Sequence, residues 1–296
     1  MTNNNNNIVP HLWFDMEAIE VANFYVSIFP GSEITGQTAI SGTPGGDVDV
    51  VTFDLSGNSF VAINAGPMFK INPSISFYVY CGSEQEVGRL YNELSNGGMV
   101  MMPLDKYPWS GKYAWIQDKF GLTWQLDIND VIGHQKILPS LLFANEKYDR
   151  VKEAVGFYTS VFTGSKIIME APYDKSANLP DDTLLFAQFK LDNFLINAMS
   201  SILKHDFDFN EAVSLMVYCE TQDEIDYYWN KLADEGEEQQ CGWIKDKFGV
   251  SWQVVPTEMD KMMMTTNQVQ LDRVTVAMLK MIKLSISGLR KAFDND

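Results

Sequence analysis

Two stretches of this chain repeat one order of apolar and polar residues, and each predicts a helix. Residues 24–32 read Phe-Tyr-Val-Ser-Ile-Phe-Pro-Gly-Ser, and residues 157–165 read Phe-Tyr-Thr-Ser-Val-Phe-Thr-Gly-Ser. The apolar spacing in and before these stretches is typical of a helix that packs on a sheet. Glycine is the usual residue just beyond a helix end. The same helix is therefore expected in both halves of the chain.

Two apolar runs rich in β-forming residues predict buried strands at residues 75–81 and 213–219. Each run is followed by a hydroxyl residue, Ser83 or Thr221, with a glutamate three positions later. This spacing is a capping box, in which the hydroxyl and the glutamate bond free backbone amides of the first helical turn. A second helix is therefore expected after each strand.

The closest repeat lies at residues 115–126 and 243–254, which both contain Asp-Lys-Phe-Gly between two β-rich runs. This pattern predicts a hairpin whose glycine takes the positive φ of the turn. Trp124 and Gln125 follow each other on the closing strand, so they must point to opposite faces of the sheet. Only one of them can face a binding site.

Further hairpins are predicted at residues 48–64 and 183–197, so each half contains two βαβββ units. The predicted fold class is α+β, with two tandem domains that each consist of two βαβββ modules in a curled mixed sheet. The predicted divisions are a disordered tail at 1–7, a first domain at 8–130, a second domain at 137–256 and a helical extension at 257–296.

The two halves differ in one connection, and a further segment lies beyond the repeat. The first half has 17 positions from Gly98 to Trp115, whereas the second has 7 from Gly236 to Trp243 (115 minus 98, and 243 minus 236). Residues 99–109 therefore predict either a flap or a longer edge hairpin. Residues 270–293 predict an amphipathic helix that docks on its own domains or on a second subunit.

Composition narrows the possible partners. Apolar residues make up 46% and charged residues 21% of the 296 residues, as in globular proteins. A formal charge of −17 argues against binding to nucleic acid or to an anionic membrane. The three cysteines lack CxxC spacing, and no run of about 18 apolar residues exists, so we expect free thiols and a cytoplasmic protein.

Several motifs resemble those of the PhnB-like branch of the vicinal oxygen chelate superfamily, which also contains glyoxalase I and bleomycin-resistance proteins. They lie at residues 10–15, 24–29, 65–67 and 237–249. The resemblance implies paired modules that curl into one cup per half, a small-molecule ligand and a homodimer. It implies no nucleotide cofactor, and the glycine-rich residues 42–46 agree because a predicted strand, not a helix, comes after them.

The resemblance also implies a divalent metal ion bound by His, Gln or Glu side chains. In metal-dependent members a glutamate stands four positions after the turn glycine, but Gln125 and Gln253 stand there in this chain. The ligand position on the first strand falls near His11 in one half and near Ser140 in the other. His11 and Gln125 remain as candidate metal ligands, although one histidine and one amide give a divalent ion few donors and no charge. The alternative is that His11 is an ordinary interfacial residue of its strand.

Aromatic and amide side chains remain for binding an uncharged, partly apolar ligand. The predicted ligand-binding residues are Trp13, Asn64, Trp115, Gln125, Asn197, Trp243 and Gln253. One hypothesis is a glyoxalase-like protein of uncharacterised substrate with an altered metal site. The alternative is a non-catalytic protein that binds or sequesters a small molecule, as bleomycin-resistance proteins do. A third is methyl transfer, which the name often given to the family suggests. Whether the protein is an enzyme is left open.

Overall fold

The computed structural model describes residues 7–43, 46–129 and 135–295. Of the predicted tail at 1–7, only Asn7 lies within the described residues. None of the helices in these ranges is long and apolar enough to cross a membrane.

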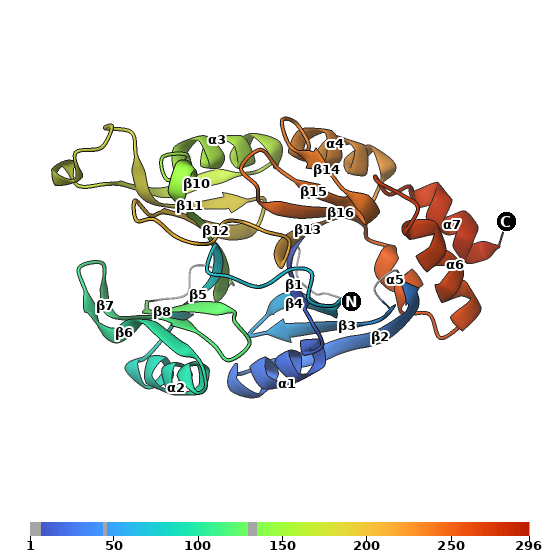
Figure 1. Cartoon of the computed structure of the whole chain (residues 1–296), viewed down its shortest axis with the longest axis horizontal. Coiled ribbons are helices and arrows are strands. Elements are labelled where there is room, and N and C mark those ends of the chain that lie inside the picture. Colours follow the sequence, from blue (N-terminus) through green and yellow to red (C-terminus); the bar gives the residue numbers. More distant parts are fainter. Residues whose placement is uncertain (1–6, 44–45, 130–134, 296) are drawn as a thin grey trace.

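Four βαβββ modules follow one another along the chain, as predicted (Figure 1). The first comprises β1 (Ile8–Phe14), α1 (Ala18–Ile28), β2 (Glu33–Thr43), β3 (Gly46–Leu55) and β4 (Asn58–Asn64). The second comprises β5 (Ile75–Cys81), α2 (Glu84–Ser95), β6 (Met99–Tyr107), β7 (Ser110–Gln117) and β8 (Thr123–Ile128). The third comprises β9 (Ile137–Phe143), α3 (Val151–Val161), β10 (Lys166–Pro172), β11 (Leu184–Leu191) and β12 (Phe194–Ser200). The fourth comprises β13 (Val213–Cys219), α4 (Gln222–Leu232), β14 (Glu237–Glu238), β15 (Trp243–Lys245) and β16 (Ser251–Pro256).

The strands form two eight-stranded sheets, and each sheet takes one module from each half of the chain. Sheet A has the order β14-β15-β16-β13-β1-β4-β3-β2, so it joins the fourth module to the first. Sheet B has the order β10-β11-β12-β9-β5-β8-β7-β6, so it joins the third module to the second. The predicted modules and curled sheets are confirmed. The expectation that each half builds its own cup is corrected, because both cups contain strands from both halves.

The central strand pairs explain why the sequence did not reveal this exchange. β1 pairs antiparallel with β13, and β5 pairs antiparallel with β9. Every residue of β5 and of β9 is buried. A strand buried on both faces lacks the alternation that marks an outer face, so its composition does not identify its neighbour.

Helices cover the outer side of the sheets, with α1 and α2 on one side of the molecule and α3 and α4 on the other (Figure 1). The apolar side chains beneath them form one continuous core that includes both sheets. Phe60 of sheet A, for example, contacts Phe77 of sheet B with ring centroids 5.2 Å apart.

The aspartate of each repeated Asp-Lys-Phe-Gly turn is buried in this core. Asp118 Oδ2 accepts hydrogen bonds from the Tyr25 hydroxyl at 2.6 Å and from Trp124 Nε1 at 2.8 Å. Asp246 accepts the same two kinds of bond in the second half. Burial raises the pKa of both carboxyl groups. Trp124 thus belongs to the core, and Gln125 points to the opposite, concave face, as the alternation required.

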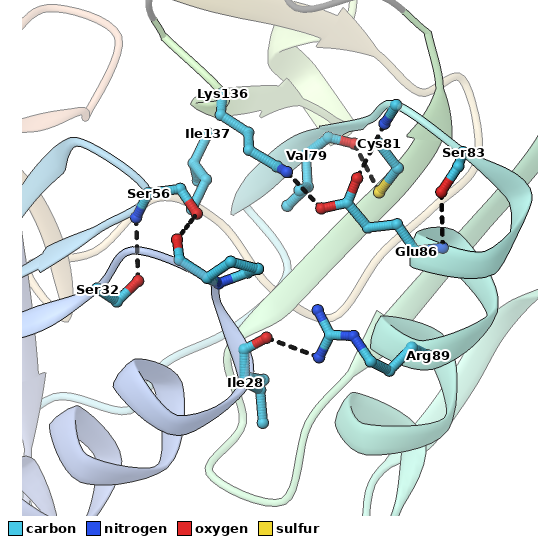
Figure 2. Close-up of polar contacts among 12 residues, drawn as sticks. Ile28, Ser32, Ser56, Val79, Cys81, Ser83, Glu86, Arg89, Lys136 and Ile137 are labelled. Atoms are coloured by element: carbon cyan, nitrogen blue, oxygen red, sulfur yellow. Dashed lines mark hydrogen bonds and ion pairs between the residues drawn. The ribbon is translucent and has the colours of Figure 1, made fainter.

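Polar contacts join α1, α2 and the start of the third module (Figure 2). Ser83 Oγ accepts a hydrogen bond from Glu86 N at 3.1 Å, which confirms the predicted start of α2. The Glu86 side chain accepts from Gly82 N at 2.9 Å, one residue earlier than the predicted capping box requires. The Glu86 carboxylate forms an ion pair with Lys136, just before β9. Arg89 Nη1 donates to the Ile28 carbonyl at the end of α1, at 2.7 Å. The modules of one half therefore touch through their helices while their strands belong to different sheets.

The C-terminal segment forms α5 (Met259–Met263), α6 (Gln268–Met278) and α7 (Ile286–Asp294). The single helix predicted over 270–293 is therefore wrong. Between α6 and α7 the carbonyls of Met281 and Ile282 accept hydrogen bonds from the backbone amides of Cys241 and Gly242, both at 2.7 Å. These bonds replace helical ones. The segment packs against its own chain, over the concave face of sheet A (Figure 1).

The longer connection of the first half is the hairpin of β6 and β7 at the edge of sheet B. Its aromatic side chains gather near the turn, where the rings of Tyr107 and Trp109 stack with centroids 5.1 Å apart. Tyr113 contacts both of these rings. The edge-hairpin interpretation describes this arrangement, and movement of the hairpin as a flap remains a prediction.

Candidate functional site

A cavity of about 610 Å³ lies on the concave face of sheet A, between its strands and the C-terminal helices. Strands of the first and fourth modules supply its floor, and α5, the end of α6 and the loop after it close one side. Lining side chains from the floor include His11, Trp13, Val61, Met216, Trp243 and Gln253. Those from the C-terminal segment include Met259, Asp260, Met263, Met264, Met278 and Leu284.

Aromatic rings form one wall of the cavity. Trp13 and Trp243 meet edge to face with centroids 6.2 Å apart, and Phe69 packs on Trp13 at 5.0 Å. His11 meets the ring of Trp243 at 5.4 Å. The Trp13 indole nitrogen donates to the Gly66 carbonyl at 2.7 Å, which fixes that ring in place. The wall is therefore largely preformed.

A short chain of polar groups crosses the floor of the cavity. Gln253 Nε2 donates to Ser214 Oγ at 2.9 Å, and Ser214 Oγ lies 3.4 Å from His11 Nδ1. In one tautomer of His11 the serine hydroxyl donates to Nδ1 while its oxygen accepts from Gln253. In that tautomer His11 carries its proton on Nε2 and offers a donor to the cavity. Burial lowers the pKa of His11 to about 3, so the ring is neutral at physiological pH.

Two acidic side chains also line the cavity, and their surroundings differ. Glu211 pairs with Lys245 Nζ at 2.7 Å and accepts from Gln239 Nε2 at 3.1 Å. Asp260, on α5, accepts a hydrogen bond from the Tyr218 hydroxyl at 3.1 Å. No Lys, Arg or His in the described ranges forms an ion pair with Asp260, and burial raises the pKa of its carboxyl group. Asp260 is thus the acidic group in the lining that forms no ion pair with a described Lys, Arg or His.

Sheet B has tyrosines where sheet A has its cavity. Tyr78, Tyr80 and Tyr113 pack with Leu138 and Leu195 on the concave face. The strand registers place Tyr78 opposite Gln125 and Met216 opposite Gln253, so tyrosine and methionine occupy equivalent positions.

The Tyr78 hydroxyl donates to the buried Asp127 at 2.7 Å, and Ser110 donates to the same carboxylate. Val255 takes the position of Asp127 in sheet A, because Asp127 and Val255 both follow the repeated glutamine by two residues. Sheet A therefore has neither this ring nor its acceptor, which leaves open space above its floor.

The amides of sheet B are also bonded to one another. Gln125 accepts from the Tyr113 hydroxyl at 2.7 Å and donates to Ser76 Oγ at 2.7 Å. Asn197 donates to Ser140 Oγ at 3.1 Å and accepts from Gln188 Nε2 at 2.9 Å. Their hydrogen-bonding groups thus have partners within the sheet and do not point into open space.

The structure divides the residues predicted from the sequence between three places. Trp13, Trp243, Gln253 and His11 come together in the cavity of sheet A. Trp115, Gln125 and Asn197 lie on sheet B.

Asn64 is elsewhere: its side chain accepts from the backbone amide of Ala18 at 2.6 Å and so caps α1. Asn64 and Asn197 end the predicted hairpins at 48–64 and 183–197, but they do not occupy equivalent positions. The register places Val61 opposite His11 and Asn197 opposite Ser140, which makes Val61 the counterpart of Asn197.

Methionines of the C-terminal segment are the lining residues that sequence reasoning missed. Met259, Met263 and Met264 belong to a run with four methionines between positions 259 and 264, interrupted only by Asp260 and Lys261. Such flexible, polarisable side chains are common at surfaces that adapt to apolar ligands. The high number of methionines at residues 259–264 was the sequence signal that could have indicated these lining residues.

Comparison with known proteins gives the family of the chain. Residues 6–127 and 135–255 match the family model described as 3-demethylubiquinone-9 3-methyltransferase. The chain belongs to this family. A PhnB protein from Bacillus cereus is 35% identical over 41% of this chain and 98% of its own, with a TM-score of 0.39. Glyoxalase I from Zea mays is 10% identical over 86% of this chain and 96% of its own, with a TM-score of 0.58. No curated protein matches the chain.

These matches confirm the PhnB-like and glyoxalase-like resemblance, and the likeness to glyoxalase I concerns the fold alone. The divalent metal that this fold implies does not fit the donors of this family member. His11 and Gln125 lie on different sheets, so they do not form one ligand set. In sheet A, His11 is accompanied by Ser214 and Gln253, whose amide nitrogen points at the serine. The described residues contain no group of three His, Cys, Asp or Glu side chains that could hold an ion.

Proposed function

We propose that the cavity on sheet A binds a mainly apolar small molecule that carries a carbonyl or hydroxyl group. The contrast between the two sheets carries this proposal. Both have the same strand order and the same serine and glutamine on equivalent strands, yet sheet A keeps a cavity of about 610 Å³ while tyrosines pack on sheet B. Sheet B then serves as the scaffold.

The polar groups of sheet A suit such a ligand. His11 Nε2, protonated when Ser214 donates to Nδ1, would donate to a ligand oxygen, and Gln253 Oε1 would accept from a ligand hydroxyl. The tryptophans supply flat apolar contact with little loss of conformational entropy, and the methionines of α5 adapt to the ligand's shape. A few placed polar groups in an apolar cavity are typical of small-molecule sites.

Binding without metal-dependent catalysis is the form of the proposal that the residues favour. A histidine whose pKa is about 3 is a weak base, and its neighbours offer no carboxylate to a metal. Methyl transfer, named in the family description, is not carried over, because the two curled sheets differ from the doubly wound parallel sheet typical of nucleotide-cofactor binding. A cytoplasmic homodimer remains a prediction.

Titration with the uncharged fluorescent probe N-phenyl-1-naphthylamine tests the proposal. The wild-type protein should increase the probe's emission in a saturable way. Met216→Tyr should weaken binding by about tenfold or more, because it places the tyrosine of sheet B at the equivalent position in the cavity. Met169→Tyr, at an exposed position on β10, is the matched control and should bind as the wild type does.

Equal probe affinity in the wild type and in folded Met216→Tyr protein would place binding outside the cavity and overturn the proposal. Urea unfolding of both variants shows that they are folded. Absence of saturable binding to the wild type would have the same consequence.

A further inference from the structure

We infer that the cavity on sheet A favours ligands with a cationic amine over ligands with an anionic group, and that Asp260 is the residue that recognises the amine. This inference rests on the proposed function. It goes beyond it by assigning a charge preference and the side chain responsible.

The charges around the cavity support this preference. Among the described residues that line it, none is lysine or arginine, so a carboxylate or phosphate would find no cationic partner there. His11 is neutral. Glu211 already pairs with Lys245 and Gln239. Asp260 is the remaining ionisable acid of the lining.

The position of Asp260 makes it available to a ligand. It lies on α5 and lines the cavity, and Tyr218 is the hydrogen-bond donor to its Oδ1 atom. No hydrogen bond to its Oδ2 atom occurs among the described residues, and that atom is not among the buried atoms that lack a partner. The second carboxylate oxygen therefore has no hydrogen-bond donor among the described residues.

The energetics point the same way. Burial raises the pKa of the Asp260 carboxyl group, because partial withdrawal from water disfavours its charged form. An ammonium group beside Asp260 would stabilise the charged form, whereas a ligand carboxylate there would be repelled. Apolar walls keep water away from the pair and so strengthen the attraction.

A purely structural role for Asp260 makes a different prediction. If its carboxylate only anchors α5 to Tyr218, removal of the Tyr218 hydroxyl should have the same effect as removal of the Asp260 charge. If it recognises an amine, Tyr218→Phe should keep the amine preference and Asp260→Asn should abolish it. Asparagine retains an oxygen that can accept the tyrosine proton, so the helix stays anchored.

Displacement of bound N-phenyl-1-naphthylamine by octylamine, octanol and octanoate near neutral pH tests the inference. These competitors share one apolar chain and differ in charge. In the wild type, octylamine should compete at least about tenfold better than octanoate, with octanol between them. Asp260→Asn should bring octylamine to the level of octanol while the affinity for the probe itself stays within about twofold.

Asp223→Asn is the matched control, because it removes the same charge from a position on α4 outside the cavity lining. It should leave the octylamine-to-octanoate ratio unchanged. The inference is overturned if the wild type does not distinguish the three competitors, if Asp260→Asn keeps the wild-type ratio, or if Tyr218→Phe lowers the ratio as much as Asp260→Asn does. Displacement by octanol shows that the cavity binds, so failure of the charge preference is separate from failure of the proposed function.

Discussion

Replacement of His11 by asparagine should make the stability of the protein less dependent on pH. Burial lowers the pKa of His11 from 6.5 to about 3. Between these values the unfolded chain binds a proton that the folded protein does not, so the wild type loses stability as the pH falls below about 6.5. Since one pKa unit corresponds to about 1.4 kcal/mol, this loss reaches about 2 kcal/mol at about pH 5. Asparagine does not titrate, so the variant lacks this contribution.

Urea unfolding of both proteins at about pH 7.5 and about pH 5 measures the effect. The free energy of unfolding of the wild type, relative to His11→Asn, should fall by about 2 kcal/mol between the two conditions. Other titrating groups, including the buried Asp118 and Asp246, contribute equally to both proteins. Their contributions therefore cancel in the difference between the two free energies of unfolding. His205→Asn, at a half-buried position in a loop, is the control for loss of a histidine.

A constant difference between wild type and His11→Asn at both pH values would refute this reasoning. NMR titration of the imidazole nitrogens gives the same information directly, because the chain has three histidines and the variant identifies one of them. An imidazole of His11 that titrates near 6.5 would show that the ring is not buried as described.

Three further predictions concern the Asp-Lys-Phe-Gly turns, Gly242 and metal ions. Asp118→Ala and Asp246→Ala should each lower the free energy of unfolding by about 3–5 kcal/mol. Each substitution leaves a buried tyrosine hydroxyl and a buried indole nitrogen without an acceptor. A loss below about 1 kcal/mol in urea unfolding would contradict this prediction. Gly242→Ala should lower the melting temperature, because Gly242 has a φ of +85° and a Cβ there would lie 2.8 Å from the Val254 carbonyl oxygen. An unchanged melting curve would be inconsistent with this contact. Treatment with EDTA, or with added Zn²⁺, should change neither the melting temperature nor probe binding. If zinc raises the melting temperature of the wild type but not that of His11→Asn, the description of the site is contradicted.

Local features of the fold could be predicted because each depends on neighbouring residues. The Ser83 and Thr221 caps and the Asp-Lys-Phe-Gly turns are recognisable from short spacings, and the structure contains them. The repeat also predicts that Trp124 and Gln125 lie on opposite faces of their strand. These features require no knowledge of strand order.

Pairing between modules could not be predicted in the same way. The candidate metal pair His11 and Gln125 assumes that both modules of one half share a sheet, whereas β1 takes β13 as its neighbour and thereby brings His11 to Gln253. In the sequence Asn64 is an amide near the end of a strand, and only the three-dimensional structure shows that it caps α1. The sequence predicts one helix over 270–293 because the apolar periodicity continues through this whole range. The helix is interrupted because the Met281 carbonyl bonds the backbone amide of Cys241, a contact that the local sequence does not reveal.

The central claim is that ligand binds on sheet A and not on sheet B, and the indole signals of the seven tryptophans test it most directly. In a ¹⁵N-labelled sample the signals are assigned with the variants Trp13→Phe, Trp115→Phe and Trp243→Phe. Trp115 and Trp243 occupy equivalent positions in the two sheets. Saturation with N-phenyl-1-naphthylamine should shift the indole signals of Trp13 and Trp243 and leave that of Trp115 in place. A shift of Trp115 with Trp13 and Trp243 unchanged would contradict the account.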